Sequence, residues 1–321
     1  MEKDLNRRRF LGAAAGTGAA LAAAGTMSPS AMAGRRRRAA QGRGDGENRP
    51  SVSNIGIQLY TMRRLMPSND RRAVRNVLNA LGAMGYREVE MAGYYGFQPR
   101  QVRNWVEAAG LEAVSGHDGF SLDKNNANWE EEYKTTLEGA VTMGQTYTGL
   151  AWFPGPYTEE FFRFLAERLQ RAGELAKDAG LQFFYHNHDF EFVNKAADGR
   201  PLYDILLETD ADLVKFELDL YWIVYGGENP LEYLSADPER YPLYHVKDRT
   251  WKDRGPDVQD WEDVGPGAID FPDIFAAGAT RGLRKHYIVE HDRPELSHPG
   301  DPEAELKTAQ AGVDYLRTVR W

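Results

Sequence analysis

Short apolar runs alternate with amphipathic segments from residue 51 to the end of the chain. Eight of these runs have the length and residue types of β-strands. They are Ile55–Tyr60, Glu88–Ala92, Glu112–His117, Tyr147–Phe153, Gln182–His188, Val214–Leu220, Leu243–Lys247 and His286–Glu290. Between them, apolar residues recur at helical spacing in Asp70–Met84, Trp129–Met143 and Thr158–Ala179, and a further helical segment, Pro302–Arg320, closes the chain. We expect Ser68-Asn69 to cap the first of these helices.

Glycine follows the predicted helices at five places, shortly before the next strand begins. These glycines are Gly85, Gly110, Gly144, Gly180 and Gly282. Because glycine readily adopts the left-handed backbone that ends a helix, the pattern predicts βα units and parallel strands. Eight such strands predict an α/β protein with a closed (β/α)8 TIM barrel. An open doubly wound sheet is the alternative, but Gly56-Ile57-Gln58-Leu59 is not a glycine-rich phosphate loop.

The first 50 residues differ in composition from the rest of the chain. Asn6-Arg7-Arg8-Arg9-Phe10-Leu11 precedes an Ala/Gly-rich stretch, and Ala31-Met32-Ala33 forms a small-residue cleavage site. This is the arrangement of a twin-arginine signal peptide. We therefore expect a signal peptide over 1–33, a disordered linker over 34–50 and the barrel over 51–321. The twin-arginine translocase would then export the protein to the periplasm or the extracellular space.

The apolar run of the signal is short and weakly hydrophobic, so we expect no stable membrane anchor. An uncleaved signal anchor is the alternative.

Charge is distributed unevenly between the two ends of this 321-residue chain. The net charge is −9, but residues 1–50 hold ten Lys/Arg against four Asp/Glu, which leaves 29 against 44 in the remainder. The body therefore carries a net charge of −15. An acidic surface repels phosphate backbones, so we expect no nucleic-acid partner. The chain has no cysteine, so disulfides and thiolate metal sites are excluded and any metal must be bound by His, Asp or Glu.

Ionisable residues gather at the ends of the last four predicted strands. Strand five ends with His186 and His188, and the next three strands contribute an aspartate, a histidine and a glutamate. Because a TIM barrel forms its site at the carboxyl ends of its strands, we expect these side chains to meet. Such a nitrogen and oxygen donor set suits Mn, Zn, Co or Mg. Each residue could instead be an ordinary strand-end residue, and Glu217 could form an ordinary surface or interface pair with Lys215.

The ends of the other strands supply further polar and aromatic side chains. Aromatic walls with a few polar groups suit the apolar faces and hydroxyls of a sugar. The candidate substrate-binding residues are Gln58, Tyr60, Glu90, His117, Trp152 and Trp222. Packing at the barrel rim is an equally good explanation for Tyr60 and Trp152.

Several longer motifs resemble the sugar phosphate isomerase/epimerase family, whose members are xylose isomerase-like TIM barrels. The motifs are Ile55–Thr61, Tyr185–Phe192, Phe216–Asp219, His245–Asp248 and Val264–Pro272. The resemblance covers residues 51–321. It implies one divalent metal bound by residues of strands five to eight.

By this resemblance, Asp219, His245 and Glu290 are metal ligands. The family usually has a glutamate as the strand-five ligand. Here His186 takes that place, and His188 lies one inward-facing position further along the strand. Either histidine could therefore be the ligand.

The resemblance also implies a metal-dependent sugar isomerase or epimerase, or a related keto-sugar lyase. Proton loss next to a carbonyl would give an enediolate that a metal stabilises. Glu290 and His188 are the candidate bases, Glu191 is a possible substitute, and Lys247 would contact a substrate oxygen. A neutral sugar or keto-sugar is the expected substrate because the body is acidic and has no clear phosphate cradle.

Two other functions remain open from the sequence. One is a metal-dependent phosphodiesterase like the apurinic endonucleases that share this barrel, and the other is a non-catalytic, exported sugar-binding barrel. The sequence leaves open whether the protein is a homo-oligomer.

Overall fold

A computed structural model describes residues 50–250 and 260–321. The predicted signal peptide over 1–33 lies outside the described residues, as does the linker over 34–50 apart from its last residue. Both assignments therefore remain predictions. None of the helices in the described ranges is long and apolar enough to span a membrane.

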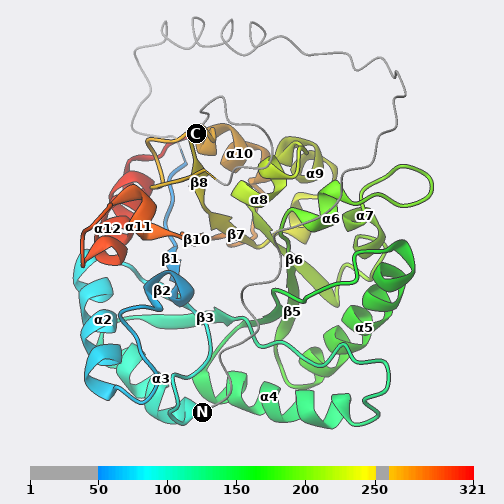
Figure 1. The fold of residues 1–321 in the computed structure, drawn as a ribbon, viewed down its shortest axis with the longest axis horizontal. Coiled ribbons are helices and arrows are strands. Elements are labelled where there is room, and N and C mark those ends of the chain that lie inside the picture. Colours follow the sequence, from blue (N-terminus) through cyan, green and yellow to red (C-terminus); the bar gives the residue numbers. More distant parts are fainter. Residues whose placement is uncertain (1–49, 251–259) are drawn as a thin grey trace, which may run out of the picture. The chain divides into compact units, whose positions relative to one another are not determined.

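Eight parallel strands form the main sheet, in the order β3-β2-β1-β10-β7-β6-β5-β4. Their bounds are β1 Ile55–Gln58, β2 Glu88–Met91, β3 Glu112–Gly116, β4 Tyr147–Leu150, β5 Gln182–His186, β6 Val214–Asp219, β7 Leu243–Val246 and β10 His286–Val289. A parallel bridge between His117 and Gly149 joins β3 to β4 at the two edges of this sheet. Helices surround the strands (Figure 1). The predicted TIM barrel is confirmed.

Five of the six longer helices lie between consecutive strands of the barrel, and the last helix follows the last strand. They are α2 Arg71–Met84, α3 Pro99–Ala108, α4 Trp129–Met143, α5 Glu159–Asp178, α10 Phe271–Gly278 and α12 Ala304–Thr318. Shorter elements are η1 Leu59–Met62, α6 Phe190–Val193, α7 Tyr203–Leu206, α8 Leu220–Tyr225, α9 Pro230–Ala236, η2 Pro238–Arg240, α11 Pro294–Ser297 and the antiparallel pair β8 Asp248–Arg249 and β9 Trp261–Glu262. The predicted bounds of α4 match residue for residue.

Two of the predicted helix boundaries need correction. The cap of α2 is Asp70, whose side chain accepts a hydrogen bond from the Ala73 amide, and not Ser68-Asn69. All five marked glycines have a positive φ, as expected for the left-handed region. However, Gly282 lies in a turn, because α10 already ends at Gly278.

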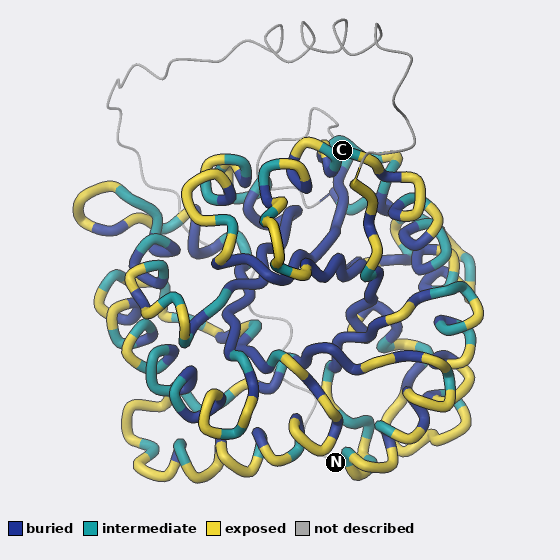
Figure 2. Tube along the Cα trace, turned by 180° about the vertical axis from the view of Figure 1, so that it is seen from behind, coloured by how far each residue is buried: buried dark blue, intermediate teal, exposed yellow. Residues whose placement is uncertain are grey.

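The barrel interior is layered along the strands. His286, Ile288 and Glu290 alternate along β10 and just past its end, so their side chains face the same way. Ile288 packs with Val114 and with two further buried residues in a small hydrophobic cluster. The strands are buried, while the outer faces of the helices are exposed (Figure 2). The small hydrophobic cluster around Ile288 therefore separates the polar groups at the strand starts from those at the strand ends.

Candidate metal centre

The four residues at the ends of strands five to eight of the barrel lie together in the structure. His186, Asp219, His245 and Glu290 come from or directly follow β5, β6, β7 and β10, which are neighbours in the sheet. One ligand atom from each lies within 4.8 Å of the others, and all four residues are buried. His186, and not His188, is the strand-five histidine in this group. The barrel thus brings together two imidazoles and two carboxylates that are far apart in sequence.

The end of β6 orients Asp219. Its Oδ1 caps α8 by accepting a hydrogen bond from the Trp222 amide at 2.9 Å. Its own amide donates to Asn187 Oδ1 at 3.0 Å, which ties the end of β6 to the residue after β5. Because Oδ1 is held by the helix terminus, Oδ2 is the oxygen that faces the cluster, 3.0 Å from Lys247 Nζ.

Lys247 lies among the carboxylates of this cluster. Its Nζ lies 3.0 Å from Asp219 Oδ2, 2.7 Å from Glu290 Oε2 and 3.0 Å from Asp292 Oδ2. Burial opposes the ammonium form, but these carboxylates outweigh it and raise the pKa of Lys247 well above its usual range. Three carboxylates therefore face one ammonium. A divalent cation would balance the excess negative charge, which is costly in a buried site.

Glu290 is held ionised by its neighbours. Burial opposes its charge, but Lys247 and His245 lower its pKa well below the usual range of a glutamate. His245 Nδ1 lies 3.0 Å from Glu290 Oε2. The donor set therefore combines a charged carboxylate with an imidazole, which fits Mn, Zn, Co or Mg.

A second group of polar residues lies on the other side of the two imidazoles. His117 and Glu217 form a second potential metal-binding group with the same His186 and His245. Glu217 is fully buried, so its interpretation as a surface partner of Lys215 was wrong. The signal in the sequence was its spacing, since Glu217 is two residues before Asp219 and therefore faces the same side of β6.

Five of the six candidate substrate-binding residues divide into two sets, and the sixth, Trp222, is buried on α8 beside His188. Gln58, Glu90 and His117 lie in the barrel interior and are hydrogen-bonded to one another. Tyr60 and Trp152 are 44% and 59% exposed, so neither belongs to the buried cluster. Both lie beyond the strands on which they were predicted.

The two strands end earlier than predicted for separate reasons. After Gln58 the chain turns into η1, and the Gln58 side chain caps that turn. The pairing of β4 with β5 stops at Leu150, which matches Tyr185. The apolar run around Trp152 therefore continues past the end of the strand.

His188 lies just beyond β5, next to the cluster. Its ring stacks on Phe190 and lies 5.5 Å from the Trp222 ring, centroid to centroid. Its Nδ1 is buried and has no hydrogen-bond partner. Burial, followed by the charge of Lys247, lowers the pKa of His188 to about 3, so the ring is neutral near pH 7.

The carboxylate of Glu191 is engaged by its own loop. It accepts a hydrogen bond from the Tyr185 hydroxyl at 2.7 Å and from the His188 amide at 2.9 Å. These contacts favour a role for Glu191 in holding His188 in place.

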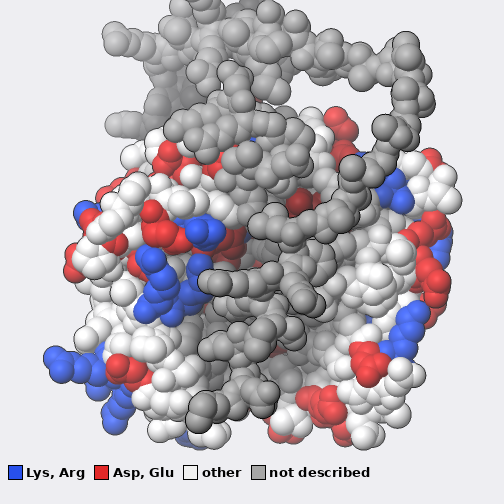
Figure 3. All heavy atoms as spheres, viewed as in Figure 1, with Lys and Arg blue, Asp and Glu red and all other residues white. Residues whose placement is uncertain are grey.

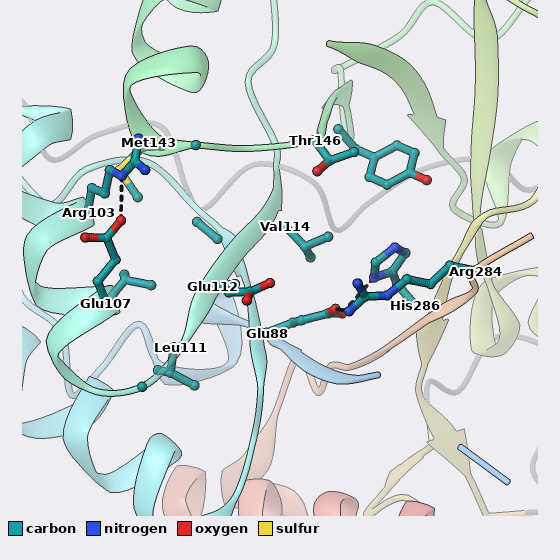
Figure 4. Close-up of a pocket in the computed structure, with 15 residues that line it drawn as sticks. Glu88, Arg103, Glu107, Leu111, Glu112, Val114, Met143, Thr146, Arg284 and His286 are labelled. Carbon is teal, nitrogen blue, oxygen red and sulfur yellow. Dashed lines mark hydrogen bonds and ion pairs between the residues drawn. The ribbon is translucent and has the colours of Figure 1, made fainter. Parts of the chain in front are cut away.

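A cavity of about 640 Å³ lies at the opposite end of the barrel, at the starts of β2, β3, β4 and β10. Figure 4 shows Glu88, Arg284 and His286 pointing toward one another there. Glu88 Oε1 lies 2.6 Å from Arg284 Nη2, and Glu88 Oε2 lies 2.7 Å from His286 Nδ1. Because these charged groups satisfy one another, and because TIM barrels form their sites at the strand ends, the cluster around Asp219 is the better candidate.

Comparison with known proteins agrees with this architecture. The family model described as "Xylose isomerase-like TIM barrel" matches residues 78–319. An inosose dehydratase of Clostridium perfringens is 27% identical over 191 residues, which cover 53% of this chain and 62% of that protein. The match therefore spans less than two thirds of that relative.

Solved structures show the same fold. A sugar phosphate isomerase/epimerase from Parabacteroides distasonis has a TM-score of 0.67 and 25% identity, over 83% of this chain and 98% of that one. The IOLI protein, solved with a bound zinc atom, has a TM-score of 0.60 and 18% identity, over 82% and 98% of the two chains. At that identity the likeness concerns the fold alone.

Proposed function

Because this chain belongs to the xylose isomerase-like TIM barrel family, we propose that it is a divalent-metal-dependent enzyme acting on a sugar or keto-sugar. The reaction would begin with proton transfer at the carbon next to a carbonyl. The observation that carries this proposal is the buried group of His186, Asp219, His245 and Glu290 at the strand ends, where carboxylates outnumber the ammonium of Lys247.

These four residues would hold the metal. A divalent cation bound there would act as a Lewis acid that polarises the substrate carbonyl and stabilises the charge of an enediolate. Manganese, zinc, cobalt and magnesium all accept this mixture of nitrogen and oxygen donors.

His188 is the candidate base, since it presents a buried ring nitrogen without a partner beside the cluster. The imidazole would accept the proton from the carbon next to the carbonyl, and the C–H electron pair would move into the enediolate. Return of a proton to the opposite face would give an epimer. Protonation and loss of a β-hydroxyl as water would give a dehydrated product.

Lys247 would donate a hydrogen bond to a substrate oxygen. Its Nζ lies 5.3 Å from the centre of the Trp222 ring, so an ammonium and an apolar face are available side by side. This combination suits a polyol, which has apolar C–H faces and hydroxyl groups.

A neutral substrate fits the surroundings better than a phosphate ester. The body carries a net charge of −15, and three carboxylates surround Lys247. Acidic and basic side chains lie next to each other in small groups on the face shown in Figure 3. The inosose dehydratase relatives favour an inosose or a similar keto-polyol and the elimination branch of the reaction.

The test is incubation of metal-loaded protein with inososes, keto-sugars and simple sugars in deuterated water. We expect deuterium at a single carbon next to a carbonyl, together with an epimerised or dehydrated product. Turnover without deuterium uptake and without release of a β-hydroxyl would contradict the proposal. Cleavage of a phosphodiester under the same conditions would instead support the endonuclease-like alternative.

Variants tie that activity to the proposed site. Asp219→Ala and His245→Ala should abolish metal retention and deuterium uptake while circular dichroism shows a folded barrel. Asp314→Ala, which removes an exposed carboxylate on α12, serves as the control and should keep both. Full metal content in the first two variants would refute the ligand assignment.

A further inference from the structure

We infer that Glu90 and Glu217 are positioning residues that fix the tautomers of His186 and His245. A single metal is then held on the outer side of the two rings, which faces Asp219 and Glu290. The inner side faces Glu90 and Glu217. This inference rests on the proposed metal site and goes beyond its four ligands. It also decides between the two overlapping groups that could hold a metal, His117 with Glu217 or Asp219 with Glu290.

The argument begins at Gln58, whose orientation is set by the backbone. The Tyr60 amide donates to Gln58 Oε1 at 3.0 Å, so the side-chain amino group must point the other way. That Nε2 lies 2.6 Å from Glu90 Oε1 and 3.3 Å from His117 Nδ1. Because Nε2 can only donate, His117 Nδ1 must accept.

The tautomer of His117 follows from this contact. A proton on its Nδ1 would meet the amino group of Gln58, so the ring proton is on Nε2. His117 Nε2 lies 2.9 Å from Glu90 Oε1 and 3.1 Å from Glu217 Oε2, and it donates to this pair of carboxylates. His117 therefore offers no free lone pair to a metal on the inner side.

The same two carboxylates face one nitrogen of each candidate ligand. His186 Nδ1 lies 3.0 Å from Glu217 Oε2, and His245 Nε2 lies 2.7 Å from Glu90 Oε1. Both glutamates are fully buried, and Ser115 Oγ donates to the remaining oxygen of Glu90 at 2.7 Å. A proton on each of these two ring nitrogens satisfies the carboxylates.

Each ring has a second nitrogen that faces the outer side. These are His186 Nε2, which lies 4.0 Å from Asp219 Oδ2, and His245 Nδ1, which lies 3.7 Å from the same oxygen. His245 Nδ1 also donates to the ionised Glu290 Oε2 at 3.0 Å, so a metal bound there would displace that proton. A histidine that binds a metal commonly donates its other N–H to a carboxylate, which fixes the ring and makes it a better ligand. Glu90 and Glu217 are placed for that role.

Nitrogen NMR of the whole protein tests the tautomers without any substitution. In [15N]histidine-labelled protein titrated with Zn²⁺, we expect two rings to show a ligand shift. Signals assigned through their β-carbons should show a proton on Nδ1 of His186 and on Nε2 of His245, with the other nitrogen of each ring bound. A ligand shift at His117, or the opposite tautomers, would place the metal on the inner side and overturn the inference.

Metal affinity provides a second, independent test. Glu217→Gln should still bind one Co²⁺ with the visible spectrum of the wild type, but with a dissociation constant raised roughly 10- to 100-fold. Asp219→Asn, the matched ligand variant, should alter that spectrum or lose the metal. Either of two outcomes would make Glu217 a metal ligand: an altered Co²⁺ spectrum in Glu217→Gln, or two bound metals in the wild type and one in Glu217→Gln. Both outcomes would contradict this inference but leave the proposed function intact. A wild type that binds no metal would refute the proposed function as well.

Discussion

Glu191 shows what burial does to a single carboxylate next to the site. Its side chain is fully buried in the loop after β5, where it accepts hydrogen bonds from the Tyr185 hydroxyl and the His188 amide. Burial raises its pKa from 4.5 to about 8, although these hydrogen bonds act in the opposite direction. The folded protein therefore keeps a proton that the unfolded chain releases. The stability linked to this proton is present below pH 4.5 and is lost as the pH rises toward 8.

Replacing Glu191 with glutamine tests this linkage. Because glutamine mimics the protonated carboxyl, the free energy of unfolding of the wild type should fall relative to that of Glu191→Gln between pH 5 and pH 8. Urea denaturation at several pH values measures the difference. Glu131→Gln, which changes an exposed carboxylate on α4, is the control and should follow the wild type. Parallel curves for the wild type and Glu191→Gln would contradict the raised pKa.

At the scale of elements, glycines within the helices mark how closely the helices approach the rest of the fold. A β-carbon at Gly173 in α5 would lie 2.7 Å from the backbone oxygen of Leu213, just before β6. A β-carbon at Gly139 in α4 would lie 3.0 Å from the hydroxyl oxygen of Tyr94, at the end of a side chain. The first neighbour is backbone and cannot move away easily, whereas the second can.

Alanine at these two glycines should therefore have opposite effects. Both substitutions gain about 1 kcal/mol of helix propensity. Gly173→Ala should nevertheless destabilise the protein by about 1–3 kcal/mol, because the new methyl group overpacks the contact between α5 and Leu213. Gly139→Ala should be neutral or stabilising. Equal free energies of unfolding for the two variants, measured in urea, would show that α5 tolerates the methyl group.

For the molecule as a whole, the proposed metal would connect four neighbouring strands, β5, β6, β7 and β10. Without it, the carboxylates of Asp219 and Glu290 face Lys247 and the imidazole of His245. A ligand that binds only the folded state stabilises it by about 2.7 kcal/mol at 100 times its dissociation constant.

Removal of metal with EDTA should therefore lower the melting temperature by roughly a few degrees. Restoring Mn²⁺ or Zn²⁺ should reverse the change. Differential scanning calorimetry measures it, and Asp219→Ala is the control that should not respond to EDTA. A wild-type melting temperature that is indifferent to EDTA and to added metal would contradict a structural contribution of the ion.

Export is a prediction about the whole molecule that concerns residues outside the described range. Lysines in place of Arg8 and Arg9 should leave the protein in the cytoplasm, because the twin-arginine pathway reads the arginine pair. Fractionation of cells that produce either the wild type or the lysine variant measures the exported share of each protein. Equal export of the wild type and the lysine variant would contradict the twin-arginine assignment.

Much of the barrel could be predicted from the sequence because its signals are local. Strand-length apolar runs and glycines after helices each depend on a few neighbouring residues, and the bounds of α4 were predicted without error. Strand ends were less accurate. The chain turns where a partner strand or a side-chain cap ends the ladder, as it does at Gln58 and Leu150.

The sequence by itself determined the barrel class and placed Asp219, His245 and Glu290 at successive strand ends, because periodicity and residue type are properties of the chain. It left His186 and His188 as alternatives at the end of strand five, and the structure brings His186 into the group. Only the tertiary structure decided which side of each ring faces which carboxylate. Glu217 and Glu90 come from strands far apart in sequence, and they meet His186 and His245 only because the sheet closes into a barrel. Distances across a closed barrel depend on every strand at once, so no local pattern encodes them.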